Sequence, residues 1–302
     1  MIYVLGSINT DMVATVPYMP VNGETISATK FFTTSGGKGS NQAVAIAKLG
    51  GKVKMIGKVG DDAQGKDLIA NLVSCGADAS NVTLSSRPTG VAMIVVENGD
   101  NRIILSAGAN HDYCEEDVEE GLKDAKEGDY LIMQLEIPMD TVCYAAELAH
   151  KKKMKVVLNP APAVALPERL LENTDIICPN ESETEILTGI AVKDDTSLAA
   201  AVSTLYRAGV KNVVITMGGK GAYVTNGSVI THIPPRKVKV VDTTGAGDTF
   251  IGALILKLSE GMPIEKAAEF ASAASSITIT REGAAKSIPT LAEVEKIINE
   301  KS

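Results

Sequence analysis

The sequence contains no tryptophan, and aromatic side chains make up only 4% of its 302 residues. It also has no uninterrupted apolar run near the ~20 residues that a membrane-spanning helix requires. Its start, residues 1–11, lacks the basic leader of a secretory signal. The four cysteines are far apart and form no CxxC pair, which disfavours disulfides and a zinc site. We therefore expect a protein of the reducing cytoplasm without a membrane partner.

Positive charge is in short supply as well, because the chain carries a net charge of −8. This balance argues against a general nucleic-acid surface. It leaves a phosphorylated ligand open, since helix ends, a few cations and a bound metal can neutralise phosphate locally. With hydrophobic residues at 45%, the chain is long enough to bury a sizeable core in one large unit or two smaller ones.

Short β-rich runs alternate with helical patterns along most of the chain. This alternation predicts an α/β fold, a three-layer sandwich in which helices flank a mostly parallel central sheet. The expected strands are residues 2–6, 54–59, 130–135, 155–158, 176–178, 213–216, 222–225 and 228–232, with the apolar run 238–241 as a further one. The expected helices are residues 41–49, 63–75, 115–126, 139–151, 181–188, 196–208, 249–259, 264–279 and 290–300.

Two early stretches interrupt the alternation. Residues 12–32 and 89–105 are strand-like and turn-rich, and they show no helical periodicity. Inserted strands of this kind predict a small second sheet that stands off the main body as a lid. We expect a single domain over residues 1–302, with lid strands inserted at about 12–34 and 89–105.

Polar side chains follow six of the predicted strands. In open α/β sheets, ligands bind beyond the carboxyl ends of the strands, so these side chains should meet along one cleft. They are Asn9 with Asp11, Glu136, Asn159, Asn180 with Glu183, Thr216, and Asp248.

The most informative motif is Asp242-Thr-Thr-Gly-Ala-Gly-Asp248-Thr-Phe250, which lies between an apolar run and an amphipathic segment. A strand, a glycine turn and a helix present free N–H groups and a positive helix end to an anion. A carboxylate at such a site repels phosphate unless it takes a proton beside it. The motif therefore indicates phosphoryl transfer to a hydroxyl, with Asp248 as the base.

Three other segments are less specific. Gly36-Gly-Lys-Gly-Ser-Asn41 has neither the Walker A nor the G-x-G-x-x-G spacing, and it is either a flexible turn or one wall of a polyol site. Asn180 to Glu183 fits a helix capping box and also a site for hydrated magnesium. The loop 216–221 is either a glycine-rich connection or a place where a nucleotide approaches the backbone.

Taken together, the motifs resemble the ribokinase-like carbohydrate kinase superfamily nearly from end to end. The matching segments are GSINTD, GGKGSNQAVAIAKLG, QLEIP, NPAP, PNESE, ITMGGKG, DTTGAGDTF and TREGAAKS. DTTGAGD marks the superfamily, and GGKGSNQA with GSINTD is most similar to its ribokinase branch. The resemblance implies ATP-dependent phosphorylation of D-ribose at O5, with ATP, Mg²⁺ and K⁺ as cofactors, and a homodimer formed through the β lid.

The resemblance also implies a role for each matching residue. The catalytic group would be Asp248 with the N–H groups of Gly245, Ala246 and Gly247. The sugar would contact Asn9, Asp11, Gly36, Gly37, Lys38, Gly39, Asn41, Glu136 and Asp248. ATP would contact Asn180, Thr216, Met217, Gly218, Gly219, Lys220, Gly221, Gly247, Asp248 and Ser272, the last standing where relatives often have asparagine. Magnesium would be held through water by Glu183, and potassium by Asp242, Thr244, Thr278, Arg281, Gly283 and Ser287.

Alternatives remain at this point. The substrate could be deoxyribose, another pentose, a ketohexose or a nucleoside. The few aromatic residues of the lid disfavour a nucleoside, whose base wants a stacking surface. A catalytically silent sugar-binding protein would keep the same fold, although the intact Asp248 and glycine turn argue against it. A nicotinamide-dependent oxidoreductase lacks its fingerprint here.

Overall fold

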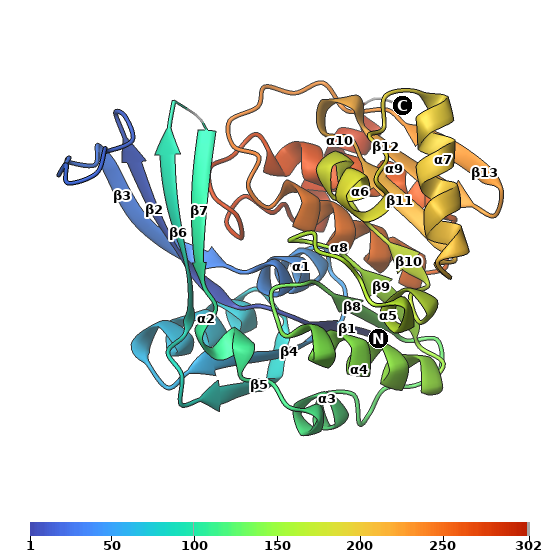
Figure 1. Ribbon diagram of the computed structural model, residues 1–302, viewed down its shortest axis with the longest axis horizontal. Coiled ribbons are helices and arrows are strands. Elements are labelled where there is room, and N and C mark those ends of the chain that lie inside the picture. The colour runs from blue at the N-terminus through green and yellow to red at the C-terminus, as the bar shows by residue number, and fades with distance from the viewer. Residues whose placement is uncertain (99, 301–302) are drawn as a thin grey trace.

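The computed structural model describes residues 1–98 and 100–300. Residues 99, 301 and 302, which belong to the predicted lid insertion and domain range, lie outside the described residues. The described chain forms a nine-stranded and a four-stranded sheet (Figure 1). In spatial order, the large sheet contains β13 (Val229–Ile233), β12 (Ala222–Asn226), β11 (Asn212–Thr216), β10 (Ile176–Ile177), β9 (Lys155–Leu158), β8 (Tyr130–Met133), β1 (Ile2–Leu5), β4 (Val53–Gly60) and β5 (Asp78–Ser85).

The large sheet is parallel from β5 to β11, and β12 and β13 add antiparallel strands at one edge. Its helices are α1 (Lys38–Lys48), α2 (Ala63–Ser74), α3 (Glu115–Gly121), α4 (Met139–Lys151), α5 (Glu168–Glu172), α6 (Glu181–Thr188), α7 (Asp195–Arg207), α8 (Ala246–Ser259), α9 (Ile264–Thr278) and α10 (Leu291–Asn299). Short 3₁₀ turns span Gly108–His111 and Gly218–Lys220.

Side chains alternate between two cores on opposite faces of the large sheet. On β1, Ile2 and Val4 pack into the core that includes α1, α2, α8 and α9, whereas Tyr3 and Leu5 pack into the core that includes α3, α4 and α7. A strand buried on both faces is apolar throughout, as its sequence is. The predicted three-layer sandwich is therefore confirmed.

The smaller sheet has the order β3 (Lys30–Gly36), β2 (Asn9–Val16), β6 (Gly90–Glu97) and β7 (Asp100–Ser106). These strands project from the body at the left of Figure 1. The predicted inserted strands thus form a second sheet, which begins at Asn9, three residues earlier than expected. Asn9 and Asp11 consequently lie on the first strand of the small sheet and not in a loop after β1.

Two local predictions are wrong, and two elements were not predicted. Residues 238–241 form no strand: the valines at 238, 240 and 241 are 39%, 55% and 53% exposed, and the two prolines after β13 remove backbone donors. The predicted helix 115–126 ends at Gly121, where glycine weakens the helical conformation. Strand β5 and helix α5 were not predicted, because β5 is half polar and α5 has only five residues.

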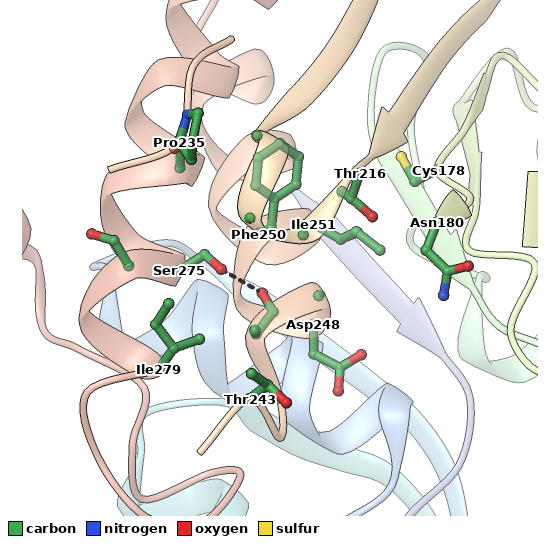
Figure 2. A pocket seen from close by; sticks show the side chains of 18 of the residues that line it. Cys178, Asn180, Thr216, Pro235, Thr243, Asp248, Phe250, Ile251, Ser275 and Ile279 are labelled. Atoms are coloured by element: carbon green, nitrogen blue, oxygen red, sulfur yellow. Dashed lines mark hydrogen bonds between the residues drawn. The ribbon is translucent and has the colours of Figure 1, made fainter. Parts of the chain in front are cut away.

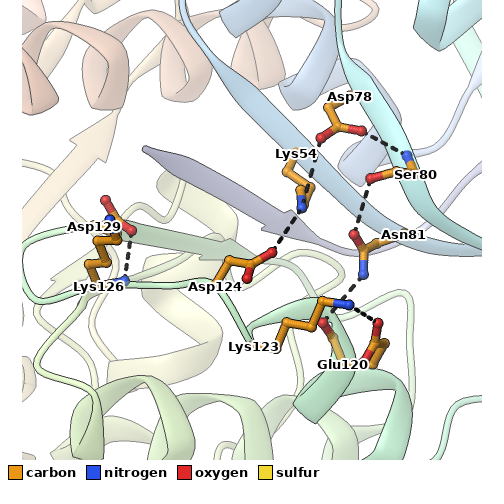
Figure 3. A network of polar contacts seen from close by, with 9 residues as sticks. All are labelled: Lys54, Asp78, Ser80, Asn81, Glu120, Lys123, Asp124, Lys126 and Asp129. Carbon is orange, nitrogen blue, oxygen red and sulfur yellow. Dashed lines mark hydrogen bonds and ion pairs between the residues drawn. The ribbon is translucent and has the colours of Figure 1, made fainter.

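Surface contacts join β4, β5 and α3 at the far edge of the large sheet (Figure 3). Lys54 Nζ lies 3.8 Å from a carboxylate oxygen of Asp78 and also of Asp124. Asn81 on β5 donates to the backbone carbonyl of Glu120 in α3 at 3.4 Å. Exposed pairs of this kind contribute at most about 1 kcal/mol each. The buried cores must therefore supply most of the stability.

Candidate active site

The first turn of α8 lies at the centre of the candidate site. Its N-cap, Gly245, has a φ of 75°, a left-handed conformation that favours glycine. Asp248 is buried in the helix that follows. Figure 2 shows its carboxylate pointing into the space between α8 and the segments that carry Asn180 and Thr216. Of the three predicted anion-binding N–H groups, that of Ala246 donates to the carbonyl of Thr243 at 3.2 Å in this structure.

A cleft of about 830 Å³ opens in front of this helix end. It brings together many of the predicted site residues: Lys38, Asn180, Glu183, Thr216, Gly218, Gly219, Gly221, Gly245, Ala246, Gly247, Asp248 and Ser272. Apolar side chains such as Phe250, Ile251 and Ile279 line another part of the wall. The cleft therefore combines a polar end beside Asp248 with an apolar surface, as ligand sites commonly do.

A second group of predicted residues surrounds Asp11. A Cβ atom on Gly36 would lie 2.1 Å from a carboxylate oxygen of Asp11, so only glycine leaves room for this side chain. Burial, together with the charges of Glu136 and Asp248, raises the pKa of Asp11 to about 7, whereas the charge of Lys38 opposes the shift. The charges of Glu136 and Asp248 thus act on the buried carboxyl of Asp11.

Backbone and side-chain contacts hold the walls of this pocket. Asn110 donates to Asn9 Oδ1 at 2.6 Å, and it also accepts from the Ile8 N–H at 2.9 Å. Glu136 Oε2 accepts from Ser7 Oγ at 2.5 Å and from the Lys38 N–H at 3.3 Å. These bonds join the segments 7–9, 36–41 and 110 around Asp11. The sequence predicted that Asn9, Asp11 and Glu136 would lie together where strands end, and the structure brings them together.

Lys38 is the cation nearest to these acidic groups. Burial alone lowers the pKa of an ammonium group, but the carboxylates of Asp248, Glu136, Glu183 and Asp11 together raise the pKa of Lys38. The side chain is therefore charged throughout the physiological range. Its position at the start of α1 places one positive charge between the Asp11 pocket and the cleft.

Asn180 and Glu183 form the predicted capping box at the start of α6. Asn180 Oδ1 accepts from the Glu183 N–H, and Glu183 Oε2 accepts from the Asn180 N–H, both at 2.8 Å. Burial and the charge of Asp248 raise the pKa of Glu183, against the hydrogen bond from Asn180 and the charge of Lys38. Glu183 Oε1 is not part of the capping box, so capping and a ligand contact are compatible.

The side chains of two predicted nucleotide-binding residues do not line the cleft. Met217 is buried in the core on the α4 face of the sheet. Lys220 is exposed, and its ammonium group donates to Glu181 at 2.8 Å. The loop contributes to the cleft through Thr216 and its glycines, whose missing side chains leave the backbone accessible.

The predicted potassium residues lie on two loops, 242–244 before α8 and 281–287 after α9, and at the last residue of α9, Thr278. Asp242 accepts from the N–H and hydroxyl of Thr244 at 2.9 and 2.7 Å and from the Gly283 N–H at 2.9 Å. Although burial opposes ionisation, the hydrogen bonds from Thr244 and Gly283 lower the pKa of Asp242. The buried Thr278 hydroxyl donates to Thr249 at 3.1 Å.

The side chains of the other two predicted potassium ligands are engaged elsewhere. The Arg281 guanidinium donates to Glu293 at 2.5 Å, and the Ser287 hydroxyl donates to the carbonyl of Ala284 at 2.7 Å. A guanidinium is itself a cation, so Arg281 could ligate potassium only through its main-chain carbonyl. A ligand set built partly from carbonyl groups thus fits these loops.

Sequence reasoning missed three buried amides at the site. Gln42 donates to Asp248 Oδ1 at 3.0 Å, Gln134 donates to Gln42, and Asn110 orients Asn9. Gln42 lies in the GGKGSNQA motif and Gln134 in the QLEIP segment, so the resemblance was the available signal for both, whereas the predicted strand 130–135 included Gln134 without giving it a role. Asn110 lies in a 3₁₀ turn that no periodicity announces.

In residues 1–98 and 100–300, no three His, Cys, Asp or Glu side chains lie close enough together to hold a metal ion. A search of the same residues finds no helix long and apolar enough to cross a membrane.

Fold and site together place a buried carboxylate, Asp248, in the first turn of a helix whose N-terminus opens on a cleft at the ends of the parallel strands. A family model described as pfkB family carbohydrate kinase matches residues 1–291. The chain therefore belongs to the pfkB family of carbohydrate kinases, which confirms the resemblance inferred from its motifs.

Individual relatives are similar over nearly their whole length. The chain is 43% identical over 292 residues to a ribokinase of Haemophilus influenzae, covering 96% of this chain and 95% of that protein. It is 37% identical over 301 residues to a deoxyribokinase of Salmonella typhi, covering 99% and 98%. The structure of Arabidopsis thaliana ribokinase complexed with ribose and ATP superposes with a TM-score of 0.91, at 33% identity and 98% coverage of both chains.

The raised pKa of Asp11 should make stability depend on pH. The ordinary aspartate value is 3.8, and the folded-state pKa is about 7. The cost of ionising Asp11 on folding therefore grows above pH 4 and is complete above about pH 7. Because Asp11→Asn removes this cost, it should raise the free energy of unfolding by about 2–3 kcal/mol more at pH 8 than at pH 5, measured by urea denaturation.

Asp242→Asn is the matched control. Since the pKa of Asp242 is lowered by folding, its carboxylate stabilises the protein above the unfolded-state pKa. This substitution should lower stability at both pH values. A gain for Asp11→Asn that is larger at pH 5 than at pH 8 would contradict the assignment of the raised pKa.

Proposed function

We propose that this protein transfers the γ-phosphoryl group of ATP to O5 of D-ribose, giving D-ribose 5-phosphate and ADP. One observation carries the proposal: the buried Asp248 carboxylate lines the cleft at the start of α8 and lies close enough to Asp11 for its charge to raise the pKa of that carboxyl. A proton acceptor between a polyol pocket and an anion-binding helix end is what transfer to a hydroxyl requires. The ribokinase relatives support the choice of sugar.

The pocket around Asp11 would hold the sugar. The Asp11 carboxylate would accept hydrogen bonds from two adjacent hydroxyls, and Asn9, Lys38, Asn41 and Glu136 would contact the others. Carboxylates and amides suit vicinal hydroxyls because each hydroxyl both donates and accepts. Gly36, Gly37 and Gly39 let the backbone approach, and a Cβ on Gly39 would lie 2.7 Å from the carbonyl carbon of Gly6.

At the reacting end, Asp248 would take the proton of the O5 hydroxyl as that oxygen attacks phosphorus. The N–H groups of Gly245, Ala246 and Gly247 would hold the developing charge on the transferred phosphoryl group. For Ala246 this means exchanging its present bond to Thr243. Little covalent chemistry is asked of the protein, so positioning and charge stabilisation supply most of the rate.

The cleft would bind ATP through Asn180, Thr216, the glycines 218, 219 and 221, and Ser272, with the adenine against its apolar wall. Bound magnesium would neutralise charge on the phosphates, and Glu183 Oε1, which lies outside the capping box, would hold one of its waters. Potassium would be held by Asp242, Thr244 and Thr278 together with carbonyl groups of residues 281–287. There it would favour the conformation in which the first turn of α8 receives the anion.

The small sheet would act as a lid over the sugar, excluding the water that otherwise competes as acceptor. We further propose that sheet and body form one domain and that the protein works in the cytoplasm. Four cysteines without disulfides, two of them buried, support a reducing compartment. The likeness to a deoxyribokinase makes 2-deoxyribose the second candidate substrate.

A sugar panel tests the proposed reaction. In a coupled assay of ADP release, D-ribose should show a higher kcat/KM than 2-deoxyribose, other pentoses, a ketohexose or a nucleoside. The rate with ribose should be higher in potassium chloride than in sodium chloride at equal ionic strength. A preference for deoxyribose would shift the assignment to the second candidate, and equal rates in the two salts would count against the cation site.

Removal of the base should affect turnover far more than binding. We expect Asp248→Ala to lose roughly 10²–10⁴-fold in kcat, the usual contribution of a general base. Asp11→Ala is the matched comparison, because it removes a buried carboxylate of the same pocket and should mainly raise the KM for ribose. Near-normal ribose-dependent ADP release by Asp248→Ala would refute the role of Asp248.

The lid supports a homodimer. Its edge strand β7 exposes three consecutive apolar side chains, Ile103, Ile104 and Leu105, so both faces of the sheet are apolar at this edge. An open apolar edge invites pairing with another strand or sheet. Light scattering should give twice the mass of one chain, and Ile104→Asp should shift it toward one. The control is Val229→Asp, an exposed valine on β13 at an edge of the large sheet, which should leave the mass unchanged. A monomeric wild type would exclude the dimer.

A further inference from the structure

Gln42 is completely buried and joins three polar groups. Its Nε2 donates to Asp248 Oδ1 at 3.0 Å and to Asn159 Oδ1 at 3.1 Å, while its Oε1 accepts from Gln134 Nε2 at 2.6 Å. Gln42 lies on α1, Gln134 directly follows β8, and Asn159 directly follows β9. Three separate elements therefore meet at one amide, next to the proposed base.

The orientations of the three linked side-chain amides, Gln42, Asn159 and Gln134, follow from one backbone carbonyl group. Asn159 Nδ2 donates to the carbonyl of Cys178 at 3.3 Å, and a carbonyl can only accept. Asn159 must therefore present Oδ1 to Gln42, which must answer with Nε2. Because Gln42 then uses both of its N–H bonds, on Asn159 and on Asp248, its Oε1 faces Gln134, which donates.

Each oxygen of Asp248 has an amide donor, but the two donors differ. Oδ1 accepts from Gln42, whose amide nitrogen and oxygen both have further hydrogen-bond partners. Oδ2 accepts from Asn41 Nδ2 at 3.0 Å, and Asn41 Oδ1 is buried without a partner. Asn41 thus has one unsatisfied acceptor, which a hydroxyl donating to its Oδ1 beside Asp248 Oδ2 would satisfy.

We propose that Gln42 is a positioning residue that holds Asp248 Oδ1, so that Oδ2 receives the substrate proton. Asn41 occupies Oδ2 until the sugar hydroxyl takes its place. The inference rests on the proposed function, since it assigns the proton to one oxygen of the proposed base. In the transfer, the hydroxyl O–H bond breaks, its electron pair attacks phosphorus, and the proton goes to Oδ2 while ADP leaves.

Gln134 ends this series of amides and is held there by packing, because its Oε1 is buried without a hydrogen-bond partner. A Cβ on Gly6, the residue after β1, would lie 1.9 Å from Gln134 Oε1, so glycine is needed there to seat Gln134. Gln134 itself contacts neither Asp248 nor the cleft lining. It can influence Asp248 only by keeping the amide of Gln42 in the donating orientation, which separates its effect from that of Gln42.

The test compares Gln42→Met, Gln42→Glu and Gln134→Met in the full-length protein. We expect Gln42→Met to lower kcat with ribose about 10- to 100-fold, the effect of losing a hydrogen bond to a charged group. The KM values for ribose and ATP should stay within about threefold, because Gln42 touches neither proposed substrate position. Gln42→Glu should lower kcat still further, because it replaces the amide donor with a carboxylate that faces Asp248 Oδ1. If Gln42 acted through packing alone, the Glu and Met variants should have similar kcat values.

The double variant reports whether Gln134 acts through Gln42. Gln134→Met should lower kcat several-fold in the otherwise unchanged protein and less than twofold in the presence of Gln42→Met. If Gln42→Met does not fold, the kcat of Gln134→Met decides: a several-fold loss at unchanged KM supports the proposal, and an unchanged kcat overturns it.

Thr174→Val is the matched control for the loss of a buried polar contact. The Thr174 hydroxyl is fully buried and donates to the carbonyl of Leu170 at 2.7 Å, away from the site. It should lower the thermal midpoint without changing kcat. An active wild type with unchanged kcat in Gln42→Met, or a change in KM alone, overturns this inference. Failure of the wild type to phosphorylate any sugar overturns the proposed function with it.

Discussion

The close packing of α1 against α8 is the contact on which the rest of the site depends. A Cβ on Gly252 would lie 2.8 Å from the Cβ of Ala45 and 3.0 Å from the carbonyl of Gln42. Glycine and alanine thus let the two helices approach until their first turns face the same cavity. Only at this separation can Asn41 and Gln42 reach the carboxylate of Asp248. The proposed base, sugar site and anion-binding helix end therefore depend on one packing contact between small residues.

This arrangement concentrates negative charge where little water remains. Asp11 responds by a raised pKa, whereas Asp248 is held by two neutral amides. The structure thus separates two demands on buried carboxylates. A sugar-binding carboxylate can wait partly protonated until hydroxyls arrive. A proton acceptor must be held in place beforehand, because reorienting it during the reaction would cost part of the catalytic gain.

Much of this could be predicted from the sequence, because strand ends and glycine turns carry local signals. The alternation of strands and helices predicted the layers, and the polar residues after the strands predicted the cleft. Gln42 and Gln134 could not be found in this way, since a buried glutamine has no periodic pattern and its role depends on partners ninety or more residues away. Residues 238–241 show the opposite failure: their pattern is typical of a strand, but no neighbouring strand offers a partner.

The contacts that hold the small sheet and those that hold Asp248 differ in strength. Lys30 on β3 pairs with Glu282 in the loop after α9, which joins the lid to the segment that holds Asp242. Both side chains are exposed, so the pair contributes at most about 1 kcal/mol and weakens in salt. The amide chain at Asp248 is buried, and a missing partner there costs the full desolvation of a polar group. The proposed base is consequently held more firmly than the small sheet is held at Lys30, so closure of that sheet as a lid would leave Asp248 in place.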